Sequence, residues 1–213
     1  TLVVTGGYNA DFDGDQMSIH VPLSTKAVEE AKRVMISTEN LLKPSDGSMI
    51  AAPSKIMIFG LYYMTVLNEE HPMPKRIFAN EEEVLYALEG EKSISLRQLL
   101  KVRMNGQIVE TTAGRIIFNR ILPTSFEYLN SPITKTDIGK ILARALEMED
   151  KEVVVRLIDG IKELGLNYGT ISGHSVSLSD FEVPVTLDAL VEEGKQAVSE
   201  IDKNYRRGLI TQK

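Results

Sequence analysis

Apolar residues recur at intervals of three and four along much of the chain, and this spacing predicts amphipathic helices. The first stripe runs from Ala27 to Met35 and follows Ser24, a residue type suited to a helix N-cap. Further helices are expected over residues 81–88, 114–121, 136–148, 151–164 and 186 to about 205. Gly165 and Gly208 stand where the last two of these helices are expected to end.

A smaller β component is predicted by short apolar runs beside turn residues. Leu2 to Thr5 and Ser18 to Val21 flank a centre rich in Gly and Asp, which favours two short strands joined by a polar loop. Asn105-Gly106 lies between two strand-like runs and predicts a tight hairpin. Residues 43–47 predict a turn, whereas the apolar run from Ile56 to Met64 fits neither a helix nor a strand by period alone. The expected fold class is mixed α/β.

The charge balance limits what the surface can bind. With 24 Lys and Arg against 30 Asp and Glu, the net charge is -6, so any nucleic-acid contact must be local, because phosphate binding requires clustered basic side chains. Basic residues gather between Lys92 and Arg120, after an acidic stretch at residues 68–91 that we expect to be a surface segment. Both stretches are also typical of ordinary solvated faces.

The chain has none of the sequence features of a membrane or disulfide-rich protein. No run approaches the length of a membrane span, the start lacks the layout of a signal peptide, and there is no cysteine. These features predict a protein of a soluble compartment. Because Leu2-Val3-Val4 already has strand character, we expect the chain to begin inside a longer polypeptide.

The clearest candidate for chemistry is a group of three carboxylates within five residues, Asp11, Asp13 and Asp15. Residues 1–21 contain no Lys or Arg to neutralise them. At this spacing the three side chains do not share a helix face, and along a strand they would lie side by side and repel. A curled loop would make them converge, and Gly14 supplies the backbone freedom for it.

Converging carboxylates without basic neighbours predict a bound cation or raised carboxyl pKa values. Oxygen ligands favour Mg²⁺, Mn²⁺ or Ca²⁺ over zinc. An EF-hand is excluded, because Gln16 stands where that loop needs glycine and Pro22 where it needs a bidentate Glu. Mg²⁺ shared with substrate phosphate fits best, although the same pattern is typical of an acidic surface turn, and the residues alone leave both interpretations open.

Residues 9–17, NADFDGDQM, resemble the signature of the beta-prime subunit of multisubunit RNA polymerases, in the form with Gln16 before Met17 that is similar to bacterial and plastid enzymes. The resemblance continues in the family's order and covers essentially the whole chain. Its other segments are residues 20–24, 60–65, 111–115 and 173–177. Residues 5–8, Thr-Gly-Gly-Tyr, depart from the family's proline-containing approach to the signature.

The resemblance implies an architecture in three parts. Residues 1–23 would be the end of a double-psi β-barrel whose loop carries the catalytic aspartates. Residues 24–185 would form a mostly α-helical pore domain that lines the secondary channel. Residues 186–213 would begin a rim helix that pairs with an antiparallel helix beyond Lys213.

The resemblance also implies roles for individual residues. In the family the three aspartates hold one Mg²⁺ tightly and help to bring in a second with the nucleotide, for in-line nucleotidyl transfer that releases pyrophosphate. Substrate binding is implied for Asn9, near the sugar of the reacting nucleotide, for Gln16, and for Lys55, which stands where relatives usually carry Gln.

The implied partners are those of an RNA polymerase: the beta, alpha and omega subunits, a sigma factor, template DNA, nascent RNA, nucleoside triphosphates and transcript-cleavage factors at the secondary channel. The implied location is the cytoplasm, in the bacterial nucleoid, or a plastid.

Two other classes of function fit the residues, a free-standing cation-binding module and a structural interaction domain. We expect the isolated chain to be inactive, because the family's bridge helix and trigger loop lie outside it.

Overall fold

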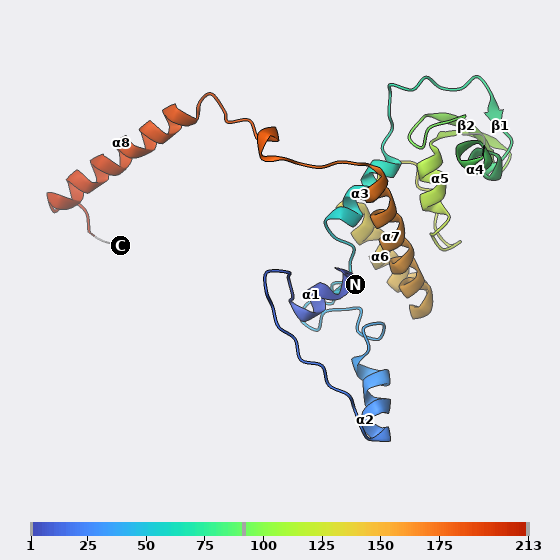
Figure 1. The fold of residues 1–213 in the computed structure, drawn as a ribbon, viewed down its shortest axis with the longest axis horizontal. Helices are drawn as coiled ribbons and strands as arrows, with labels where there is room; N and C mark the ends of the chain where they lie inside the picture. The colour runs from blue at the N-terminus through green and yellow to red at the C-terminus, as the bar shows by residue number, and fades with distance from the viewer. Residues whose placement is uncertain (1, 91–92, 212–213) are drawn as a thin grey trace. The chain divides into compact units, whose positions relative to one another are not determined.

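The computed structural model describes residues 2–90 and 93–211, and residues 1, 91, 92, 212 and 213 lie outside the described part. The described chain is mixed α/β, mainly helical with one three-stranded sheet (Figure 1), which confirms the predicted fold class at this coarse level. It divides after Gly173 into two compact units, residues 1–173 and 174–213. No helix in the described ranges is long and apolar enough to span a membrane.

Two short helical turns open the chain, η1 (Leu2–Val4) and α1 (Thr5–Tyr8), where the sequence pattern predicts a strand. Residues 18–21 form neither a helix nor a strand. Both strand predictions are therefore wrong for this chain, because a strand must pair its backbone with a neighbour, and the sheet of the described residues contains neither segment. The double-psi barrel stays a prediction.

The next helix begins where it was predicted. α2 (Thr25–Glu30) is capped by Ser24, whose Oγ accepts a hydrogen bond from the backbone N–H of Ala27 at 3.2 Å. It continues as a π-helical turn, η2 (Ala31–Met35). Within this unit the end of its apolar stripe is exposed, with Met35 at 73% of its full accessibility.

The core of the first unit is centred on two helices, α3 (Ile56–Thr65) and α7 (Lys151–Ile171). Their backbones approach at glycines: a Cβ on Gly60 would lie 1.9 Å from the carbonyl oxygen of Gly165, and one on Gly165 would lie 2.5 Å from that of Met57. Gly165 therefore lies inside α7, and the prediction that the helix ends there is wrong. Its missing side chain serves the helix crossing instead of a C-terminal cap.

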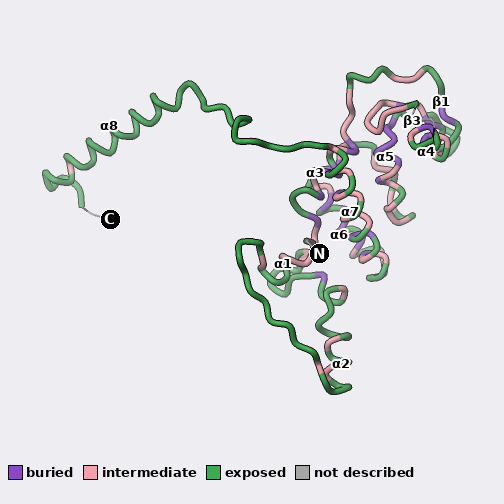
Figure 2. The backbone as a smooth tube through the Cα atoms, viewed as in Figure 1, coloured by how far each residue is buried: buried purple, intermediate pink, exposed green. Residues whose placement is uncertain are grey.

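Two further helices complete this core, α5 (Ala113–Asn119) and α6 (Lys135–Met148), both where the sequence predicts them. α6 begins with a capping box, in which Thr134 and Asp137 each bond the other's backbone N–H. Figure 2 shows the buried positions gathered on these helices. The most buried apolar side chains of this core are Met57, Leu61, Met64, Phe118, Ile133, Leu142, Ala145, Val154, Leu157 and Ile161.

The sheet has the order β1-β2-β3, made of β1 (Ile77–Phe78), β2 (Leu100–Met104) and β3 (Gln107–Thr111). β1 is parallel to β2, and β2 is antiparallel to β3 with Met104 opposite Gln107. The turn between β2 and β3 has positive φ at both Asn105 (49°) and Gly106 (80°), as a two-residue type I′ turn requires. The predicted hairpin is confirmed.

α4 (Glu81–Glu89) covers the sheet and confirms the helix predicted in the acidic stretch. Asn80 caps it by accepting a hydrogen bond from the backbone N–H of Glu83 at 2.9 Å. The described acidic side chains of this stretch are exposed or half-buried, as a surface segment requires. Its apolar residues Phe78, Val84 and Ala87 are nevertheless buried, in a second core with the sheet and α5. That core contains Phe78, Val84, Ala87, Leu100, Val102, Ala113 and Ile116. Two residues of the charged stretches, Glu91 and Lys92, lie outside the described part.

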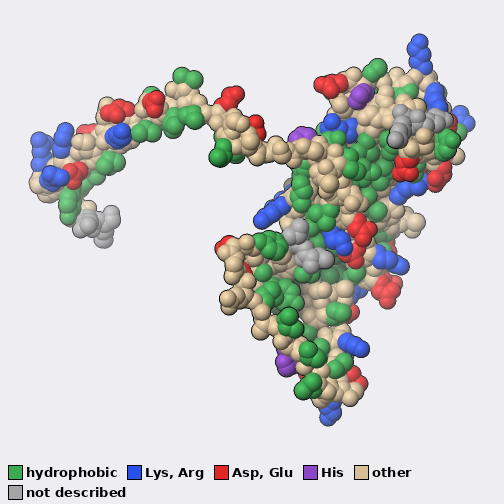
Figure 3. Space-filling view, viewed as in Figure 1, with side chains coloured by type: hydrophobic (Ala, Val, Ile, Leu, Met, Phe, Trp, Pro, Cys, Tyr) green, Lys and Arg blue, Asp and Glu red, His purple; other side chains and the backbone are tan. Residues whose placement is uncertain are grey.

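The second unit contains a short 3-10 turn, η3 (Leu178–Asp180), and a long helix, α8 (Leu187–Arg206). α8 confirms the helix predicted from residue 186. Gly208, at φ 72°, follows its C-cap residue Arg207 and ends the helix as predicted. Figure 3 shows hydrophobic side chains along α8 beside charged ones. None of the α8 residues is buried. The domain boundaries implied at residues 23 and 185 stay a prediction.

Candidate metal centre

The carboxylate loop begins directly after α1. Asn9, at the C-terminus of that helix, adopts the left-handed conformation (φ 48°, ψ 41°), which Asn tolerates better than most residues. Gly14 has φ 120°, a value that favours glycine. These two residues turn the backbone at either end of the loop, so that the segment between them curls.

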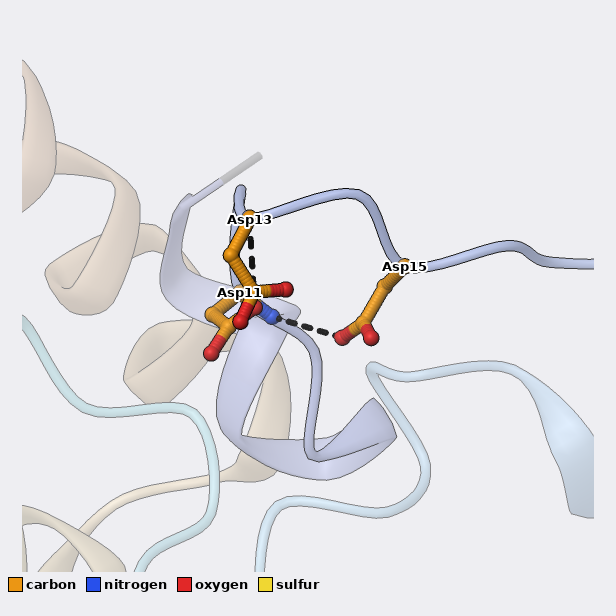
Figure 4. A group of neighbouring side chains, drawn as sticks. All are labelled: Asp11, Asp13 and Asp15. Carbon is orange, nitrogen blue, oxygen red and sulfur yellow. Dashed lines mark hydrogen bonds between the residues drawn. The ribbon is translucent and has the colours of Figure 1, made fainter.

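The curl brings the three aspartates together. One carboxylate oxygen from each of Asp11, Asp13 and Asp15 lies within 4.8 Å of the other two. Two hydrogen bonds hold this arrangement (Figure 4): Asp15 Oδ2 accepts from the backbone N–H of Asp11 at 3.2 Å, and Asp11 Oδ1 accepts from that of Asp13 at 3.3 Å. All three side chains are exposed, so the open side of the cluster is accessible to solutes.

Local electrostatics favour the ionised form of Asp11. Hydrogen bonds from the side chain and the backbone of Asp13 lower the pKa of the Asp11 carboxyl, and the positive charge of Lys55 lowers it further. An ionised carboxylate is the form that ligates a metal ion. The state of Asp11 thus suits a cation ligand near neutral pH.

The donor set fits a hard divalent cation. Each aspartate offers carboxylate oxygen, the ligand that Mg²⁺, Mn²⁺ and Ca²⁺ prefer, and the cluster contains no nitrogen or sulfur donor that would favour zinc. Three carboxylates leave part of an octahedral Mg²⁺ shell to water or substrate oxygens. The identity of the ion and the role of these residues as its ligands stay predictions.

The remaining predicted site residues lie in two places. Asn9 and Gln16 are exposed and flank the aspartates along the same loop. Lys55 immediately precedes α3, with an exposed side chain and φ 49°. Its positive charge contributes least among the effects that lower the pKa of Asp11.

The fold and the site together define a class: a mixed α/β chain that presents an exposed carboxylate cluster suited to a hard divalent cation. Comparison with known families makes this specific. Residues 40–181 match the family described as RNA polymerase Rpb1, domain 3, and residues 1–37 match RNA polymerase Rpb1, domain 2. The chain belongs to the RNA polymerase Rpb1 family, in its bacterial beta-prime form.

Curated relatives support this assignment over nearly the whole chain. It is 39% identical over 211 residues to the DNA-directed RNA polymerase subunit beta' of Pelotomaculum thermopropionicum, an alignment that covers 99% of the chain and 18% of the relative. The subunits beta' of Moorella thermoacetica (38%; 99% and 18% covered) and Leptospira biflexa (37%; 98% and 14% covered) are similar. The chain thus spans less than a fifth of the length of these relatives.

Proposed function

We propose that this chain forms part of the active centre of a DNA-dependent RNA polymerase, in which Asp11, Asp13 and Asp15 hold the Mg²⁺ used for template-directed nucleotidyl transfer. The observation that carries the proposal is the convergence of the three carboxylates on an exposed loop. The chain belongs to the Rpb1 family. The resemblance of residues 9–17 to the signature of that family implies a divalent cation at this cluster. An acidic surface turn would need no such convergence.

Each residue has a proposed task in this mechanism. The three aspartates would hold the cation and would help to hold a second one that is bound with the nucleotide. When bound, such ions stabilise negative charge on phosphate oxygens and lower the pKa of a coordinated hydroxyl. Asn9 contacts the sugar of the incoming nucleotide, and Gln16 and Lys55 bind the substrate. A side-chain general base is not required.

The surrounding architecture follows from the same proposal. Residues 1–23 would complete their strands only against the rest of a double-psi β-barrel, and residues 24–185 would line the secondary channel. The stripe of α8 would then pack on an antiparallel rim helix. Proposed partners are the other polymerase subunits with a sigma factor, template DNA, nascent RNA, nucleoside triphosphates and transcript-cleavage factors. The location would be the bacterial cytoplasm or a plastid.

The test replaces one aspartate at a time by Asn in the assembled polymerase. Asn keeps the size of the side chain and removes the charge that holds the cation. We expect each variant to lower the rate of RNA extension by about two orders of magnitude or more, since metal ions contribute several kcal/mol to charge stabilisation. Assembly should be retained, because the three side chains are exposed and contribute no core packing.

Asp46→Asn is the matched control. Asp46 is also an exposed loop aspartate, and its carboxylate accepts hydrogen bonds from the backbone and side chain of Ser48. This variant should extend RNA at the normal rate. Near-normal extension by any variant of the three cluster aspartates would refute the metal assignment, as would equal loss in the control.

A further inference from the structure

The hairpin of β2 and β3 leaves one edge of the sheet open in the described part of the chain, because the strand order β1-β2-β3 makes β3 an outer strand. In a two-residue hairpin the residues that flank the turn, here Met104 and Gln107, exchange backbone hydrogen bonds, and such pairs then alternate along the strands. The backbone groups of Ile108 and Glu110 therefore point away from β2. An outer strand with open backbone groups is a template for pairing with another strand.

The contacts of Glu110 agree with this orientation. Its carbonyl oxygen accepts a hydrogen bond from Asn130 Nδ2 at 2.8 Å, as expected for a carbonyl directed away from β2. No backbone hydrogen bond from described residues outside the sheet reaches Ile108, which keeps 52% of its accessibility. The N–H and C=O of Ile108 and the N–H of Glu110 are thus open to a further strand.

A groove of about 520 Å³ lies beside this edge and offers room for side chains. Gln107 and Val109 of β3 line it together with Tyr128. Tyr128 lies next to the end of β3, because its hydroxyl group is hydrogen-bonded to Thr111 Oγ1 at 2.8 Å. Successive side chains of a strand point to opposite faces, so every second residue of an added strand would enter this groove. Val109 and Tyr128 suit an apolar side chain there.

The charged side chains of the groove are unequally matched. Arg120 forms ion pairs with both Glu81 and Glu82, and all three line the groove. Arg103 also lines it, and no carboxylate among the described residues pairs with this arginine. A carboxylate of a bound segment would form a charge-assisted hydrogen bond with Arg103. The groove therefore fits an apolar and an acidic side chain on the same face of one strand.

We propose that the open edge of β3 is an assembly surface, on which an extended segment of the polymerase outside residues 1–213 adds as a further strand. Main-chain hydrogen bonds to Ile108 and Glu110 hold the segment, and alternate side chains give specificity. An apolar residue packs on Val109 and Tyr128, and an acidic residue two positions away meets Arg103. The relatives provide ample chain for this role, since the chain spans less than a fifth of their length.

This inference rests on the proposed function only in that the chain must be part of an assembled polymerase, and it does not involve the carboxylate cluster. The test measures hydrogen exchange of single β3 amides in that polymerase, by mass spectrometry with gas-phase fragmentation. On an open edge the amides of Ile108 and Glu110 exchange fast and that of Val109 slowly, because Val109 bonds to β2. An added strand removes this alternation. We expect exchange at Ile108 and Glu110 to be at least about 100-fold slower than in an unprotected amide.

Two substitutions at one position separate strand pairing from simple burial. Ile108→Pro removes the outward N–H and leaves the bonds between β2 and β3 in place, since an outer strand tolerates proline where the N–H faces away from the sheet. Exchange at Glu110 should then become fast. Ile108→Thr also removes the isoleucine side chain but keeps the N–H, so Glu110 should stay slow. Slow exchange at Val109 in both variants shows that the hairpin is folded.

A photo-crosslinking amino acid in place of Gln107 identifies the segment that covers the edge. Because Gln107 lines the groove, the crosslink should form in the assembled polymerase with a segment outside residues 1–213. That segment should carry an apolar and an acidic residue two positions apart, as the surroundings of Val109 and Arg103 require.

The outcomes separate this inference from the proposed function. Slow exchange at Ile108 and Glu110 that Ile108→Pro abolishes, with a crosslinked segment of the stated pattern, supports the added strand. Fast exchange at both amides in a polymerase that extends RNA overturns it and leaves the proposed function intact. Slow exchange that survives in Ile108→Pro, or a crosslinked segment without the pattern, also overturns it. The proposed function fails independently, through normal RNA extension by Asp13→Asn.

Discussion

Two helices of nearly equal length, α7 with 21 residues and α8 with 20, differ completely in what they bury. α7 lies in the first unit and has one face closed by neighbouring helices. Its buried residues are Val154, Leu157, Ile158, Ile161, Gly165 and Gly169. α8 carries a comparable stripe in the second unit, yet Leu190 and Val198 keep 61% and 67% of their accessibility.

The difference shows that periodicity defines an apolar face but does not supply its partner. Both sequences meet the same helical pattern, and the pattern predicts both helices correctly. An isolated helix of about 20 residues is only marginally stable in water, because most helical stability in proteins comes from burying one face. α8 therefore depends on a surface that the described part of its own unit does not provide.

The largest expected difference between the two helices is in hydrogen exchange. Backbone amides in the centre of α7 should exchange only when the whole first unit unfolds, which costs about 5 kcal/mol or more. Amides of residues 190–205 in α8 should exchange through local opening of the helix, with a free energy close to zero. The comparison is measured by mass spectrometry on the isolated chain. In the assembled polymerase the same α8 amides should become strongly protected.

This experiment also tests the proposed rim helix. Strong protection of α8 in the isolated chain would mean that its stripe is already buried, and the assignment to a rim helix would then fail. Weak protection in the assembled enzyme would show that no partner covers the stripe there.

The next effect in size concerns side-chain truncation. Ile161→Ala in α7 removes a fully buried side chain and should lower the free energy of unfolding of the first unit by about 2 to 5 kcal/mol. Leu190→Ala in α8 removes an exposed one and should change stability by less than about 0.5 kcal/mol. Urea unfolding followed by circular dichroism gives both values. If both variants lowered the free energy of unfolding by similar amounts, α7 and α8 would not differ in how deeply their apolar faces are buried.

The smallest expected difference in stability is between glycine-to-alanine substitutions in the two helices. Gly165→Ala places a methyl group 2.5 Å from the Met57 carbonyl oxygen, so the α3–α7 crossing must open, at a cost of about 1 to 3 kcal/mol. Gly194→Ala in α8 meets no atom within 4 Å and should stabilise that helix by up to about 1 kcal/mol. Thermal melting and helical circular dichroism measure the two changes. Stabilisation by Gly165→Ala would refute the close crossing.

Local features of this protein could be predicted from its sequence because their causes lie within a few residues. The hairpin at Asn105-Gly106 needs positive φ at two adjacent positions, and the cap at Ser24 needs one side-chain oxygen three residues before a free N–H. The convergence of the aspartates likewise follows from their spacing and from Gly14. No distant residue is required for any of these features.

Other features were decided by contacts between distant segments. Gly165 reads as a helix end in the sequence but lies within α7, because the backbone of α3 occupies the space beside it. Residues 2–5 read as a strand but form helical turns in this chain, since a strand needs a paired neighbour. Ile50 lies beside Gly6 and Gly7 of α1, and this contact joins segments that are far apart along the chain. In each case the deciding free energy comes from atoms far away along the chain, which periodicity and spacing cannot report.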